Sequence, residues 1–125
     1  MILAIDTTDK ECFIELIDRN RTSLKWHWQK DTGQEVLKKI DQLLKQNRKK
    51  LRDLEAILVN QGPGSFTGTR VGITIANTLG WVLDIPVIGY RDGELKKVLA
   101  EVNKKCKLKF SKLALPYYVF LKKSR

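Results

Sequence analysis

The sequence predicts a single α/β domain built on a mixed five-stranded sheet, with helices on both faces and a short basic C-terminal segment. Its 125 residues suffice for one hydrophobic core, and its apolar residues fall in short periodic blocks rather than in one long run. The first blocks have the two-residue period of strands, and later blocks acquire the helical period. From residue 33 onward helix-like and strand-like blocks alternate, which is typical of domains with parallel strands.

The first three blocks predict an antiparallel meander. Residues 2–6 and 12–17 have the composition of strands and are separated by a short polar turn. Residues 18–21 connect to a third strand, whose single histidine, His27, is expected to be exposed. Apolar and polar residues alternate on that strand, with Leu24, Trp26 and Trp28 on one side and Lys25, His27 and Gln29 on the other.

The next segment predicts a helix over residues 33–47 and then a buried strand. Thr32 and Glu35 have the spacing of a capping box, in which each side chain accepts a hydrogen bond from the backbone amide of the other residue. Residues 54–59 are apolar at nearly every position, as expected of a central parallel strand buried on both faces. The apolar residues of the helix follow helical spacing: Val36, Leu37, Ile40, Leu43 and Leu44.

A glycine-rich segment introduces a second helix at residues 67–83. This helix is apolar or small on almost every side, so one of its two packed faces needs a partner other than the sheet. Residues 85–89 predict a further strand, and Asp92 is expected to cap a third helix. That helix is predicted from apolar residues at helical spacing: Leu95, Val98, Leu99 and Val102.

Positive charge is concentrated at the C-terminal end of the chain. The formal net charge is +10; residues 1–90 carry 13 basic and 11 acidic side chains, whereas residues 91–125 carry 11 and 3. We therefore divide the chain into a domain over residues 1–102 and a basic extension over residues 103–125. An edge strand is expected in the extension, either at residues 116–121 or where lysines alternate with Cys106, Leu108 and Phe110.

The sequence predicts a cytoplasmic protein without a membrane partner. No apolar run approaches the roughly 20 residues that span a bilayer, and the first residues lack the features of a signal peptide. Cys12 and Cys106 lie far apart and outside any CxxC or Cys/His pattern. They are expected to be reduced, buried thiols that bind no metal.

The order of the predicted elements is that of an RNase H-like lobe, the unit that builds the actin/sugar-kinase superfamily. Residues 2–8 resemble the first-strand motif of that superfamily. Residues 62–72, Gly-Pro-Gly-Ser-Phe-Thr-Gly-Thr-Arg-Val-Gly, resemble the GPGSFTGxRxG signature of the TsaB (YeaZ) family, and the resemblance covers about residues 1–100. The residues that carry it are Asp6, Thr7, Thr8, Gly62, Pro63, Gly64, Ser65, Phe66, Thr67, Gly68, Arg70 and Gly72.

The resemblance implies the first lobe of a two-lobed TsaB protein, with the second lobe missing, and a non-catalytic scaffold role. The expected partner is TsaD, the catalytic paralogue that transfers the threonylcarbamoyl group to a tRNA adenosine; a second copy of the chain and TsaE are further candidates. No metal or cofactor is expected on the chain alone, and a nucleotide (ATP or ADP) only at an interface with TsaD. In this family the first lobes pair through two helices, so the expected interface residues are Val36, Leu37, Ile40, Leu44, Thr67, Arg70, Val71, Thr74, Ile75 and Thr78.

The glycine-rich segment has two physical explanations. Glycine amides ahead of a helix can bind an anion, or the glycines can allow close packing between helix and sheet. We favour packing, because the segment lacks the Lys-Ser/Thr ending with which a P-loop holds phosphate and metal.

Two other functions compete with the scaffold role. An RNase H-like nuclease, or a degenerate one, would need several carboxylates around two metal ions, but Asp6 is the one acid at a strand end and the fourth strand ends in Asn60. A nucleic-acid-binding module would use the basic extension, whose lysines either contact tRNA phosphates or protect an edge strand from aggregation. The candidate tRNA contacts are Lys104, Lys105, Lys107, Lys109 and Lys112.

Overall fold

The computed structural model describes the backbone of residues 1–28 and 32–109 and the side chains of residues 1–28 and 33–102. Its five-stranded sheet has the order β3-β2-β1-β4-β5. The first three strands form an antiparallel meander, whereas β1 and β4, and β4 and β5, are parallel. The predicted mixed sheet is therefore confirmed. Its strands are β1 (Ile2–Asp6), β2 (Glu11–Ile17), β3 (Arg21–His27), β4 (Ala56–Asn60) and β5 (Val87–Tyr90).

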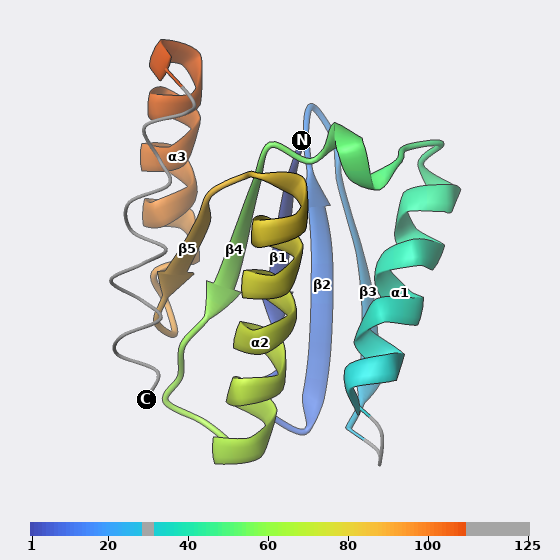
Figure 1. The fold of residues 1–125 in the computed structure, drawn as a ribbon. Coiled ribbons are helices and arrows are strands. Elements are labelled where there is room, and N and C mark those ends of the chain that lie inside the picture. Colours follow the sequence, from blue (N-terminus) through green and yellow to red (C-terminus); the bar gives the residue numbers. More distant parts are fainter. Residues whose placement is uncertain (29–31, 110–125) are drawn as a thin grey trace.

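Two helices cover one face of the sheet and a third covers the other (Figure 1). Helices α1 (Thr32–Gln46) and α2 (Phe66–Leu83) lie side by side and run in the same direction (Figure 1). Helix α3 (Leu95–Lys109) packs on the opposite face, and a short 3-10 helix, η1 (Leu51–Asp53), connects α1 to β4. The prediction of helices on both faces is confirmed.

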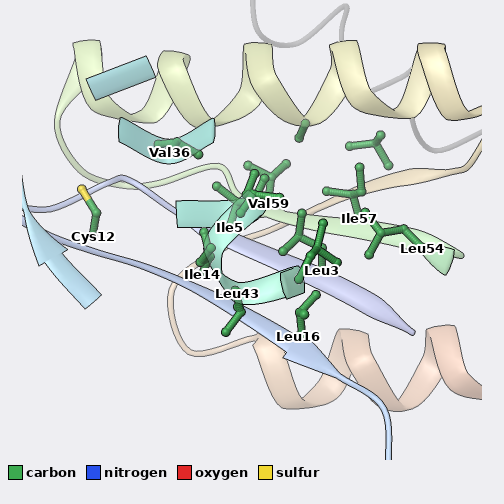
Figure 2. Packing of buried hydrophobic residues seen from close by; sticks show 14 of the residues in the cluster. Leu3, Ile5, Cys12, Ile14, Leu16, Val36, Leu43, Leu54, Ile57 and Val59 are labelled. Atoms are coloured by element: carbon green, nitrogen blue, oxygen red, sulfur yellow. The ribbon is translucent and has the colours of Figure 1, made fainter. Parts of the chain in front are cut away.

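The alternation of β1 shows how the sequence divides the core between the two faces. Leu3 and Ile5 pack against α1 and α2, whereas Ile2 and Ala4 pack against α3. All residues of β4 are buried, as expected of a strand with a helix layer on each side. Figure 2 shows the larger cluster, in which Val36 of α1 meets the side chains of the sheet.

Part of the predicted C-terminal extension is helical instead of extended. Helix α3 continues to Lys109, so the strand inferred from the alternation of Cys106, Leu108 and lysines is wrong up to that residue. Lysine and leucine are good helix formers, and the helix is already anchored to the sheet by Leu99 and Val102. Phe110, Lys112 and the strand predicted at residues 116–121 lie outside the described residues.

The two predicted helix caps differ in their outcome. Asp92 does not cap α3, because the helix begins three residues later and its first turn is preceded by Glu94, whose carboxylate accepts a hydrogen bond from the Arg91 amide at 3.1 Å. The Asp92 carboxylate instead accepts a hydrogen bond from Asn60. Thr32 is the first residue of α1, and the capping box rests on its side chain, which lies outside the described side chains.

Candidate partner interface on helix α2

The loop between β4 and α2 is packed against the turn that follows β1. The Ser65 hydroxyl accepts a hydrogen bond from the Gly68 amide at 3.2 Å and so caps α2. The Ser65 amide donates to the Thr8 carbonyl at 2.7 Å, and the Thr7 hydroxyl donates to the Gly68 carbonyl. These bonds fix the start of α2 above the carboxyl end of β1.

The glycines of this loop and helix are required by close contact with the same turn. A Cβ atom on Gly64 would collide with the Thr8 carbonyl oxygen, and one on Gly68 with the Thr7 carbonyl oxygen. On Gly72, a Cβ would lie 2.5 Å from the Thr7 hydroxyl oxygen. The contacts support the packing explanation of the motif over an anion site.

Asp6 belongs to a hydrogen-bonded network that joins three chain segments. One carboxylate oxygen accepts from the Thr8 amide at 3.0 Å and the Thr8 hydroxyl at 2.7 Å, and the other accepts from the Asn60 side-chain amide at 3.0 Å. Asn60 also donates to Asp92 at 2.6 Å and accepts from the Gly62 amide at 2.8 Å. Over the residues that the structure describes, no group of three or more His, Cys, Asp or Glu side chains could hold a metal ion. The Asp6 carboxylate thus accepts three hydrogen bonds that tie the turn after β1 to the end of β4.

Two buried titratable groups adjoin this network. Burial raises the pKa of the Tyr90 phenol, and the nearby carboxylates of Asp6 and Asp92 raise it further. Burial, followed by the charges of Asp6 and Asp9, raises the pKa of the Cys12 thiol to about 11. Both shifts favour the neutral form of these side chains at physiological pH.

The outer surface of α2 is exposed along its length and has little charge. Phe66 and Trp81, near its two ends, are each 74% exposed, and Val82 is 70% exposed. A shallow groove of about 430 Å³ lies between the first turns of α2 and the start of α1. Among the described residues that line it, Arg70 alone is charged, and its guanidinium lies 4.7 Å from the centre of the Phe66 ring. The lining residues are Gly33, Phe66, Thr67, Arg70, Val71, Thr74 and Ile75.

The structure places the expected interface residues in two groups. Thr67, Arg70, Thr74 and Thr78 are exposed, Val71 and Ile75 are half-buried, and Leu37 of α1 is 49% exposed. Val36, Ile40 and Leu44 are instead buried in the core. Assigning these three to a partner interface was wrong, because the apolar stripe of α1 is used against the sheet.

Sequence reasoning missed the exposed aromatic residues at both ends of α2 as interface candidates. Phe66 follows the helix cap, and Trp81 and Val82 lie just before the helix end. Large apolar residues at such positions can equally well face the core, so residue type alone did not mark them as exposed. For Trp81, the spacing from earlier helix residues was a usable signal. Trp81 lies seven residues after Thr74, which itself lies seven residues after Thr67, so Trp81 shares one side of the helix with these two predicted interface residues.

Several other predicted residues have simpler outcomes. His27 is exposed on β3, and Cys12 is a free, buried thiol, as predicted. Lys104, Lys105, Lys107 and Lys109 lie in the last turns of α3, but their side chains are outside the described set, as are the side chain of Cys106 and all of Lys112.

In the described part of the chain, no helix has both the length and the apolar character to span a membrane.

Comparisons with known proteins connect this chain to a family. A family model described as TsaD, tRNA N6-adenosine threonylcarbamoyltransferase, matches residues 29–114. The chain is 36% identical over 88 residues to the tRNA threonylcarbamoyladenosine biosynthesis protein TsaB of Bacillus subtilis, covering 69% of this chain and 38% of that protein. The chain belongs to the TsaB (YeaZ) family. The TsaB of Escherichia coli is 35% identical over 91 residues, covering 70% of this chain and 38% of that protein.

The TsaB fold is matched as well as its sequence. YeaZ from Pseudomonas aeruginosa superimposes with a TM-score of 0.69 at 29% identity, covering 73% of this chain and 43% of that one. The chain thus spans about two fifths of the length of the B. subtilis and E. coli TsaB proteins. The predicted family and fold are both confirmed, and the signature glycines have a direct role in placing α2 on the sheet.

Proposed function

We propose that this chain is a non-catalytic scaffold that binds a TsaD-type transferase through the exposed side of α2 and so supports threonylcarbamoyladenosine formation in tRNA. The observation that carries the proposal is the apolar and threonine-rich surface between Phe66 and Trp81, with its groove beside the start of α1. The proposed site consists of Leu37, Phe66, Thr67, Arg70, Val71, Thr74, Ile75, Thr78 and Trp81, and is called the α2 surface below.

The physical character of the α2 surface supports association. Interface centres are depleted of charge and enriched in aromatic residues and arginine, and Phe66, Trp81 and Arg70 supply these types. The residues project from a helix whose other side is fixed by glycine contacts to β1 and β5, so little ordering accompanies binding. The names of the TsaB relatives, which specify biosynthesis of threonylcarbamoyladenosine in tRNA, indicate the process.

The arrangement of Asp6 favours a scaffold over a nuclease. Three hydrogen-bond donors occupy the Asp6 carboxylate, and Asn60 stands at the end of β4 where a second metal-binding acid would be required. ATP or ADP, in this proposal, binds at a shared interface with the transferase and not on this chain alone. TsaE is a further partner of the assembled complex, and self-pairing through the α2 surface is the competing mode.

A pair of matched variants tests the interface. Thr74→Glu places a carboxylate in the groove, and burying this charge against a partner costs more than pairing with Arg70, one turn earlier, returns, so transferase binding should weaken by about 30-fold. Gln42→Glu adds the same charge at an exposed position of α1 away from the groove and should bind normally. Titration calorimetry with the purified transferase measures both, and circular dichroism verifies their folds. Equal affinities for the two variants would place the interface elsewhere.

A separate assay tests the absence of catalysis. The purified chain, incubated with magnesium and either ATP or RNA, should show no turnover above background. Turnover that disappears in Asp6→Ala, while the circular dichroism spectrum is retained, would contradict the scaffold assignment.

A further inference from the structure

The loop between α1 and β4 carries an exposed cluster of basic residues that the proposed interface does not use. Arg48, Lys49, Lys50 and Arg52 are all exposed, and in the described part of the chain none of them forms an ion pair. We call these four residues the α1–β4 basic loop. Of the acidic neighbours, Asp41 pairs with Lys45 at 2.9 Å and Glu55 with the Met1 amino group at 3.3 Å, while the Asp53 carboxylate accepts a hydrogen bond from a backbone amide of the loop.

The α1–β4 basic loop is held in a defined backbone conformation. Arg48 adopts a left-handed φ of 56° at the end of α1, and the Lys49 amide donates to the Leu44 carbonyl at 2.8 Å. The Lys50 amide donates to the Asp53 carboxylate at 2.8 Å, and the Asp53 amide returns a bond to the Lys50 carbonyl at 2.9 Å. Long basic side chains on a fixed backbone can contact several phosphates at a small entropic cost.

The loop lies at the opposite end of α1 from the groove of the α2 surface. Helix α1 begins at the groove and ends at the loop, and its 15 residues correspond to roughly 22 Å of helix. The loop precedes β4, and α3 runs antiparallel to β5, so the last turns of α3 reach the same end of the sheet (Figure 1). The lysine-rich part of the sequence from Lys104 to Lys109 lies in those turns.

We infer that the α1–β4 basic loop binds the phosphate backbone of structured RNA. The choice of RNA rests on the proposed function in tRNA modification, and it is favoured over a membrane by the composition of the loop. Leu51, 41% exposed, is the one exposed apolar residue between α1 and β4, whereas membrane-surface segments bury a row of apolar residues. The loop has no aromatic residue on which a base could stack, so contacts are with phosphates and show little sequence preference.

The test compares two variants of the full chain that lose the same charge. One replaces Arg48, Lys49, Lys50 and Arg52 with Gln; the control replaces Lys10, Arg91, Lys96 and Lys97, which are exposed near the opposite end of the sheet, with Gln. Binding of an unmodified tRNA transcript is titrated at several salt concentrations, without the transferase. The loop variant should lower the log-log salt slope by about three units, following counterion release, and the control by less than about one.

The expected difference in salt slope between the two variants is large enough to measure. Between about 50 mM and 200 mM salt, the wild-type chain should lose roughly 60-fold more affinity than the loop variant. A milder variant, Lys49→Gln with Arg52→Gln, should give about half the slope change, which guards against misfolding of the fourfold variant. Equal slopes for loop and control variants, or unchanged tRNA binding, would overturn the inference, as would tighter binding to phosphatidylserine vesicles than to tRNA. Thr74→Glu should leave the slope unchanged, so failure of the transferase interface is distinguishable from failure of RNA binding.

Discussion

Thr7 and Gly72 are packed so closely that a Cβ atom on Gly72 would lie 2.5 Å from the Thr7 hydroxyl oxygen. The same threonine donates a hydrogen bond to the carbonyl of Gly68, one turn earlier in α2. One steric contact and one hydrogen bond between α2 and Thr7, the residue that follows β1, therefore set how near α2 lies to the sheet. The exposed α2 surface is the opposite side of that helix, so the glycines of the signature position the proposed interface without belonging to it.

Substitution of Gly72 tests this role. Alanine is favoured over glycine in a helix by about 1 kcal/mol, but at Gly72 the collision with Thr7 should outweigh that gain and lower the free energy of unfolding by about 1 to 3 kcal/mol. Gly33→Ala in α1 is the control, because its Cβ would meet Val71 at an ordinary 4.0 Å. Urea denaturation should show a destabilised Gly72→Ala and an unchanged or more stable Gly33→Ala. A stable Gly72→Ala would show that the helix moves away at no cost.

Val36 and Leu37 are adjacent in α1 but should have opposite roles. Val36 is fully buried, so Val36→Ala should lower the free energy of unfolding by about 2 kcal/mol through lost burial and a cavity. Leu37 is half-exposed and is the α1 residue of the proposed α2 surface, so Leu37→Ala should cost less than about 1 kcal/mol of stability and yet weaken transferase binding about tenfold. Denaturation and calorimetry on both variants separate the two effects. A Leu37→Ala variant that binds normally would remove α1 from the interface.

Cys12 should make the stability of the protein depend on pH in the alkaline range. Its folded pKa is raised to about 11 from an ordinary value of 9.0, so the unfolded chain loses the thiol proton first. The contribution of Cys12 to stability is complete below about pH 9 and declines as the pH rises toward about 11. Urea midpoints measured across this range should fall more steeply for the wild type than for Cys12→Ala. Parallel pH profiles would show that the buried thiol does not titrate differently on unfolding.

The mixed sheet and its helix layers could be predicted from residue periodicity because each element buries a distinct stripe. The alternation in β3 and the helical spacing in α1 each correspond to one covered face. Periodicity could not show which surface covers a stripe. Val36, Ile40 and Leu44 were therefore assigned to a partner, although the sheet covers them.

The remaining errors arise from contacts between residues far apart in sequence. Asp92 has the composition of a helix cap, but Asn60 lies 32 positions away in the chain and provides its hydrogen bond. The lysine-rich segment that ends α3 fits the two-residue period of a strand over six residues. Packing of the preceding helical turns on the sheet nevertheless stabilises the helix. A local sequence pattern cannot predict either interaction, because each involves residues that are far apart in the chain.

Amide hydrogen exchange of the chain, alone and saturated with the TsaD-type transferase, tests the central claim most directly. Exchange should slow in peptides that cover α2 and the first half of α1, because the α2 surface becomes buried and local opening of these helices is suppressed. Peptides that cover α3 and the α1–β4 basic loop should exchange at unchanged rates. Slowed exchange in α3 with unchanged exchange in α2 would contradict the proposed interface.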